Sequence, residues 1–224
     1  MAEQKNNQAA PSMEEALNQS EAFFLKYKNA IIGCVVALVV IIGGVTLYKT
    51  YVSGPNEQKA STAIAKCQEL FQNQQFEQAL NGDSLTAGFL AIADQYSSTD
   101  AGNLANLYAG LCFANLDKWQ EAAQYLEKFD EAGDLMISPA ALGALGNAYA
   151  HLDQLDKAVS TLTKAAEKAD NNSLSPTFLI QAGQILEKQG KKADALKLYK
   201  QIKEKYFQSM QYQTIDEYIE RVSE

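Results

Sequence analysis

Twenty consecutive residues, 29–48, carry no charged side chain and read NAIIGCVVALVVIIGGVTLY. A helix rises 1.5 Å per residue, so the stretch spans about 30 Å, the thickness of the hydrocarbon core of a bilayer. Aromatic and lysine side chains flank it, as is typical of membrane helices anchored at the headgroups; they are Phe23, Phe24, Lys26, Tyr27 and Lys28 before it and Lys49 and Tyr51 after it. The sequence therefore predicts a transmembrane helix at 29–48.

A cleaved signal peptide is the competing interpretation of such a stretch near the N-terminus. The apolar run is longer than a typical signal-peptide core, and the residues that end it, VTLYKTYV, are too bulky for a cleavage site. We therefore expect an uncleaved signal anchor, with a polar tail at 1–28 and a linker at 49–56. Lysines are nearly balanced across the helix, so the orientation rests on the usual outcome for a short tail, with the N-terminus in the cytoplasm and the C-terminal domain exported.

Composition and motifs exclude several classes of function. The chain has 27 acidic and 19 basic residues, a net charge of −8, which is the wrong sign for neutralising nucleic-acid phosphates. Its three cysteines have no CxxC spacing and there is one histidine, which argues against a disulfide framework or a zinc site. Phosphate-loop, dinucleotide, hydrolase and zinc-protease motifs are absent. We expect no catalytic residues, no cofactor, no metal and no small-molecule substrate.

The region after the linker contains an internal repeat. Segments 103–129, 141–165 and 178–202 align with helical periodicity, and equivalent positions are 36 and 37 residues apart. Each segment has a glycine, a large residue, a turn residue and an alanine in the same order; these are Gly110, Phe113, Asp117 and Ala122, then Gly146, Tyr149, Asp153 and Ala158, then Gly183, Leu186, Gly190 and Ala195. The pattern predicts pairs of antiparallel helices whose backbones approach closely at the small residues.

This pattern resembles the tetratricopeptide repeat (TPR), although its usual tryptophan is replaced by Asn106, Leu142 and Leu179. The resemblance implies an all-α fold: a single N-terminal transmembrane helix followed by a TPR solenoid over 57–224. The expected units are a degenerate first unit at 57–96, with helices at 57–73 and 88–96 around an insertion, clear repeats at about 103–136, 139–172 and 176–207, and a capping helix at 211–223.

TPR domains bind an extended peptide or a partner helix in a groove lined by the first helix of each repeat. If the family's second, fifth, ninth, twelfth and thirteenth positions carry over, the groove includes Leu104, Leu107, Leu111, Asn115, Asn147, His151, Ile180 and Gln184. The lysines and arginines with which some TPR domains hold a carboxylate are absent. The resemblance therefore implies an apolar groove with a few amides. We expect Trp119 to serve in helix packing.

The whole arrangement, a short tail, one anchor helix and an acidic TPR domain, resembles the YfgM-type ancillary subunits of the bacterial Sec translocon, especially over 88–129. That resemblance implies a single-pass inner-membrane protein with a cytoplasmic N-terminus and a periplasmic TPR domain. Its implied partners are the SecYEG channel and a membrane-anchored periplasmic chaperone. Two alternatives stay open: a scaffold for another envelope complex, in cell division or secretion, and a cytoplasm-facing module that recruits proteins to the membrane.

Overall fold

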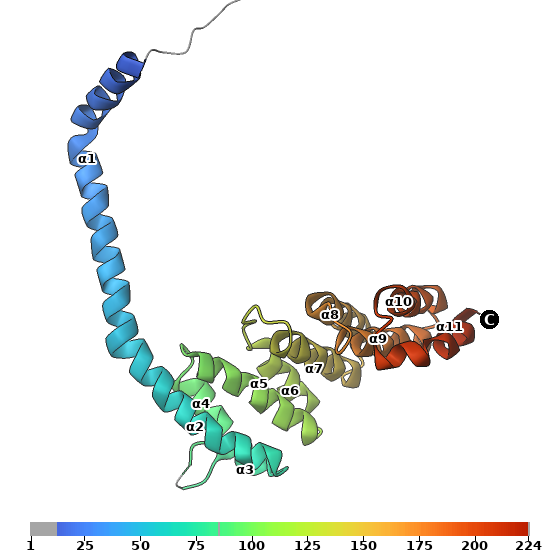
Figure 1. Ribbon diagram of the computed structural model, residues 1–224. Helices are drawn as coiled ribbons and strands as arrows, with labels where there is room; N and C mark the ends of the chain where they lie inside the picture. Colours follow the sequence, from blue (N-terminus) through green and yellow to red (C-terminus); the bar gives the residue numbers. More distant parts are fainter. Residues whose placement is uncertain (1–12, 85, 224) are drawn as a thin grey trace, which may run out of the picture. The chain divides into compact units, whose positions relative to one another are not determined.

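The computed structural model describes residues 13–84 and 86–223, which fall into two compact units that divide between Gly54 and Pro55. The first contains α1 (Met13–Tyr48) and a π-helical turn, η1 (Lys49–Ser53), in place of the expected linker (Figure 1). Side chains 39–42 of α1, all valine or isoleucine, are 60–67% exposed. The helix is long and apolar enough to cross a membrane, and we find no second such helix in the part of the chain that is described.

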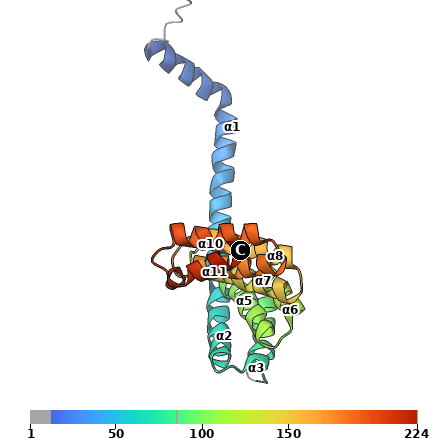
Figure 2. The same cartoon turned by 90° about the vertical axis from the view of Figure 1, so that its right-hand side faces the viewer.

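The second unit consists of helices. They are α2 (Gly54–Gln72), α3 (Phe76–Asn81), α4 (Phe89–Gln95), α5 (Asp100–Asn115), α6 (Trp119–Glu127), α7 (Ile137–His151), α8 (Leu155–Ala169), α9 (Ser175–Lys188), α10 (Lys192–Lys205), the 3₁₀ turn η2 (Met210–Gln213) and α11 (Ile215–Ser223). Figures 1 and 2 show α5 to α10 as consecutive pairs of neighbouring helices. The expected all-α helical-repeat fold is confirmed.

Glycine is required where the two helices cross in the pairs α5–α6, α7–α8 and α9–α10. A Cβ atom on Gly146 would lie 2.7 Å from Leu162 Cγ, and one on Gly110 would lie 2.6 Å from Leu126 Cγ. In the last pair, a Cβ on Gly183 would lie 2.4 Å from Tyr199 Cε1. Carbon atoms in contact are normally about 3.5–4.0 Å apart, so these positions have no room for a side chain. The repeated glycines thus set how closely the helices of a pair approach.

The same turn joins the two helices of every unit. Its central residue has a left-handed backbone at Gln74 (φ 60°), Asp117 (57°), Asp153 (57°) and Gly190 (73°). The next N–H then donates to a carbonyl of the first helix, 3.0 Å from Gln75 N to Leu70 O and 2.9 Å in the other three turns. The turn at Gln74 therefore identifies α2 and α3 as the helix pair of the first unit.

The first unit differs from the others because its second helix is interrupted. Gln74 and Asp117 are 43 residues apart, whereas the later turns are 36 and 37 residues apart. The additional residues of the first unit correspond to the loop at 82–88, which separates α3 from α4. Helix α3 was not expected from the sequence, which placed the second helix at 88–96 alone.

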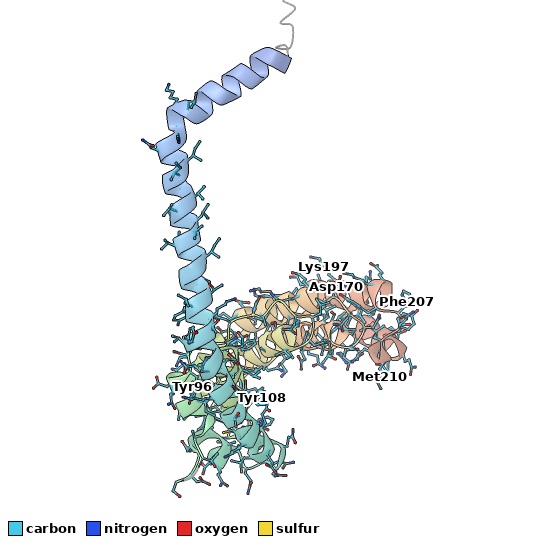
Figure 3. All side chains as sticks on the ribbon, turned by 60° about the vertical axis from the view of Figure 1, so that its left-hand side comes forward. Tyr96, Tyr108, Asp170, Lys197, Phe207 and Met210 are labelled. Atoms are coloured by element: carbon cyan, nitrogen blue, oxygen red, sulfur yellow. The ribbon has the colours of Figure 1, made fainter. Side chains whose placement is uncertain are left out.

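The C-terminal end of the repeats is covered by α11. Ile215 and Val222 are buried against the cluster that also contains Tyr199 and Ile202. Arg221 forms a bidentate pair with Glu187 of α9, with Nε–Oε2 2.8 Å and Nη2–Oε1 2.7 Å. The preceding loop leaves Phe207 and Met210 exposed, as Figure 3 shows. Helix α11 thus occupies the place that the first helix of a further repeat would take.

Candidate functional site

The first helices of three consecutive pairs, α5, α7 and α9, line a cavity of about 480 Å³, together with the start of α6. Its lining residues are Leu111, Ala114, Asn115, Trp119, Ala144, Asn147, His151 and Gln181. The residues from α7 are three and four positions apart, so they lie on one face of that helix. The cavity is the groove that a helical-repeat fold presents on its first helices.

One wall of the groove is a stacked pair of rings. The indole of Trp119 and the imidazole of His151 have centroids 3.6 Å apart and an angle of 5° between their planes. Trp119 begins α6 and His151 ends α7, so the stack connects two neighbouring units. It provides a flat, rigid surface beside the small floor residues Ala114 and Ala144.

Apart from the His151 imidazole, the polar side chains of the groove are amides. Asn115 Nδ2 donates to Leu111 O at 2.8 Å, which fixes the orientation of that amide. Gln181 Oε1 is buried and has no hydrogen-bond partner among the residues that the structure describes. A buried carbonyl oxygen without a partner is unfavourable, which favours turning of this amide towards any N–H donor that a ligand brings into the cavity. No aspartate, glutamate, lysine or arginine is among the lining residues.

The structure brings four of the eight predicted groove residues together in this cavity, namely Leu111, Asn115, Asn147 and His151. The assignment of Leu107 was wrong: it is 7% exposed and belongs to the core between α5, α6 and α7. Leu104 and Ile180 are partly buried against core clusters. Gln184 is exposed on α9 but does not line the cavity.

The error at Leu107 has a physical cause. Leu107 occupies the fifth position of its repeat, and the same position in the next repeat is Gly143. A Cβ on Gly143 would lie 2.3 Å from Cε1 of Phe178 on α9. The fifth position therefore faces a neighbouring first helix and not the open groove.

Sequence reasoning missed Ala144 and Gln181, which both occupy the sixth position of their repeats, and it expected Trp119 to serve in helix packing and not as a lining residue. The spacing of Ala144 and Asn147, three residues apart on α7, was the available signal. Gln181 had a weaker signal, because α9 carries glutamines at both 181 and 184 and periodicity alone does not separate them.

The buried thiols are unsuited to nucleophilic chemistry. Cys67 and Cys112 are both 0% exposed. Burial raises the pKa of each thiol, and that of Cys112 reaches about 12. Only the thiolate is reactive, so both cysteines act as apolar core residues. Among residues 13–84 and 86–223, we find no group of three histidine, cysteine or acidic side chains placed to hold a metal ion.

Paired helices with close glycine contacts and a groove on the first helices define a helical-repeat scaffold of the kind that binds proteins and is not usually catalytic. Residues 21–206 match the tetratricopeptide repeat-like domain family, and the chain belongs to that family. The matched segment includes the apolar stretch at 29–48 as well as the repeats.

A solved structure supports the same fold. It is that of nearly identical TPR-like repeats in a protein from Podosopora anserina described as a kinesin light chain. The two chains are 12% identical, with a TM-score of 0.52, and the alignment covers 74% of this chain and 95% of the other. At this identity the likeness shows the fold alone. A search of curated proteins found no significant match.

Proposed function

We propose that the protein is a membrane-anchored interaction module whose groove binds an extended, uncharged segment of a partner protein. The observation that carries this proposal is the cavity across α5, α7 and α9, whose lining consists of small, apolar, aromatic and amide side chains with no carboxylate, lysine or arginine among them. Once the Gln181 amide turns towards the cavity, its unpaired oxygen can accept a hydrogen bond from a main-chain N–H of an extended segment. An apolar side chain of the same segment would pack on the Trp119–His151 stack.

The proposed setting is the bacterial inner membrane, with the N-terminus in the cytoplasm and the TPR-like domain in the periplasm. The exposed apolar side chains of α1 and the inclusion of this helix in the family match support an anchor. The resemblance to YfgM-type subunits supports SecYEG and a membrane-anchored periplasmic chaperone as partners. The segment in the groove would then belong to one of these proteins or to an emerging polypeptide.

Co-purification from native membranes tests the groove. Gln181→Leu removes one hydrogen bond to the ligand, worth about 0.5–1.5 kcal/mol, so recovery of SecYEG and the chaperone should fall by roughly two- to tenfold. Leu111→Glu should reduce it further, because a ligand would bury the new carboxylate. Gln184→Leu is the matched control, since it makes the same change on the same helix outside the cavity. Equal recovery for all three variants would reject the groove as the binding site.

Orientation is tested separately with alkaline phosphatase fused after Glu224, because this enzyme is active only when exported. We expect high phosphatase activity, and digestion of the domain when protease is added to spheroplasts. An inactive fusion together with protection until lysis would support the cytoplasm-facing alternative.

A further inference from the structure

A second cavity lies away from the groove, against the first helix of the first unit. It has a volume of about 530 Å³ and is lined on α2 by Pro55, Gln58, Lys59, Thr62, Ala63 and Lys66. Thr86 and Ala87, from the loop between α3 and α4, form the opposite wall. A volume of this size lies within the usual range of ligand pockets, roughly 300–1,000 Å³.

The wall of this cavity is the 82–88 loop, the insertion that distinguishes the first unit from the other three. The loop is fixed to α2 by Cys67 Sγ, which donates to Ala87 O at 2.9 Å. It is closed internally by two hydrogen bonds between Asp83 and Thr86, from Asp83 N to Thr86 O (2.9 Å) and from Thr86 N to Asp83 Oδ1 (2.8 Å). The described residues of the insertion are therefore held by hydrogen bonds to α2 and to each other, and they shape the cavity.

Two glycines make this loop possible. A Cβ on Gly82 would lie 2.1 Å from Thr86 O, and one on Gly88 would lie 2.2 Å from Leu80 O. Both contacts are with backbone atoms, which cannot move aside as the end of a side chain can. The two ends of the loop thus touch each other directly, and the cavity wall is preformed.

The cavity is lined by two lysines and no acidic residue, although the domain as a whole has an excess of acidic residues. Lys59 and Lys66 are seven residues apart, so they lie on the same face of α2 with about 10 Å between them along the helix. Both are exposed, and neither has an ion-pair partner in the described part of the chain. Glu57, two residues before Lys59, is turned towards α5, where it accepts from Asp100 N at 2.7 Å and Ala101 N at 3.0 Å. Glu69, three residues after Lys66, is not among the residues that line the cavity.

Charge elsewhere in the domain contrasts with this arrangement. Residues 55–224 contain 15 basic and 23 acidic side chains. Most lysines of α8 and α10 are paired within the domain, for example Lys164 with Glu131 at 3.5 Å and Lys205 with Asp170 at 2.6 Å. An acidic partner would be repelled by most of the domain surface and attracted to this cavity, which confers specificity as well as affinity.

We propose that this cavity is a docking site for an acidic segment of a partner protein, with two carboxylates spaced to reach Lys59 and Lys66. Carboxylates seven residues apart on a helix, or three apart in an extended polyproline II segment, lie on one face and are about 10 Å apart. The small side chains of Thr62 and Ala63 between the lysines allow the partner backbone to approach, and the Thr86 hydroxyl offers a hydrogen bond. Two charges at this spacing fit a polypeptide better than a single lipid headgroup.

Photo-crosslinking in the cells that make the protein tests this proposal on the full chain. A benzoylphenylalanine at position 58 replaces an exposed glutamine that lines the cavity and leaves the small residues between the lysines unchanged. We expect a protein adduct whose crosslinked peptide, identified by mass spectrometry, carries carboxylates seven or three residues apart. That segment, made as a synthetic peptide, should bind the full-length protein in micelles. The double variant Lys59→Glu/Lys66→Glu should weaken this binding by about tenfold or more.

Two control variants separate charge from folding. Lys59→Arg/Lys66→Arg should retain the adduct and the peptide affinity. Lys200→Glu, which reverses an exposed lysine of α10, should leave both unchanged. An adduct with lipid, an adduct with a peptide that lacks paired carboxylates, a yield insensitive to charge reversal, or no adduct at all would overturn the proposal. Because none of these residues lines the α5–α7–α9 groove, the result does not depend on the function proposed for that groove.

Discussion

The glycine at the crossing of α7 and α8 allows a quantitative test of the repeat packing. In Gly146→Ala, the added methyl group would lie 2.7 Å from Leu162 Cγ and 3.0 Å from Leu162 Cδ2. The first distance is about 1 Å shorter than a normal carbon contact. Leu162 is 0% exposed, so its side chain has no free space into which it can turn. Either α8 moves or the contact is strained.

Two opposing terms decide the result. Overpacking a core contact costs about 1–3 kcal/mol, whereas replacing a helical glycine with alanine gains about 1 kcal/mol from helix propensity. We therefore expect Gly146→Ala to lower the free energy of unfolding by up to about 2 kcal/mol. In a Leu162→Ala background the clash is absent, and the same substitution should raise stability by about 1 kcal/mol.

Urea unfolding of the full-length protein in detergent micelles, followed by helical circular dichroism, provides the four stabilities of this cycle. The decisive quantity is the sign of the Gly146→Ala effect, which should reverse between the two backgrounds, with a coupling energy of about 1–3 kcal/mol. A stabilising effect of about 1 kcal/mol in both backgrounds would refute the close approach of α7 and α8.

Two further predictions concern the ends of helices. Asp134 accepts hydrogen bonds from the Ser138 hydroxyl and from N–H groups at the start of α7, and these bonds lower the pKa of its carboxyl to about 2. The stability that the Asp134 carboxylate contributes is therefore present above the ordinary carboxyl pKa near 4 and is lost as the pH falls towards 2. Asp134→Ala should cost about 1–2 kcal/mol near neutral pH, and urea titrations should show the gap to the parent narrowing between pH 4 and 2; a constant gap would contradict this origin. Arg221→Gln should release α11 by removing the bidentate pair with Glu187, at a cost of about 0.5–1 kcal/mol for a partly exposed pair. Hydrogen exchange should accelerate at 215–223 and stay unchanged in α7, and equal protection of α11 in both proteins would show that its apolar face alone holds it.

The repeated part of the fold was predictable because its signals are local and recur. Gly110, Gly146 and Gly183 mark helix crossings, and the left-handed residues Asp117 and Asp153 mark turns, so each repeat supports the interpretation of the others. Helix α3 lacks that support, because it is a six-residue fragment produced when the 82–88 loop interrupts a longer helix. Its existence depends on contacts with α2 and α5 that no local pattern records.

The groove was less predictable than the fold for a related reason. Helix α5 is apolar on nearly all sides, so the periodicity cannot tell Leu111, which lines the cavity, from Leu107, which is buried in the core. The distinction comes from the angle between neighbouring first helices, which is a property of the stack. The unpaired carbonyl of Gln181 is likewise visible only in three dimensions, since glutamine in a helix is ordinarily a solvated residue.

The turn shared by all four units has a consequence for how such a protein can change in length. Because each unit begins and ends with the same backbone geometry, a copy of one unit can be inserted or deleted between two turns without a new connection being invented. A duplication running from Asp117 to Asp153 would add one more first helix to the α5–α7–α9 surface and lengthen the segment that it can hold. The reach of the groove is in this sense an evolutionary variable that is independent of the chemistry of its walls.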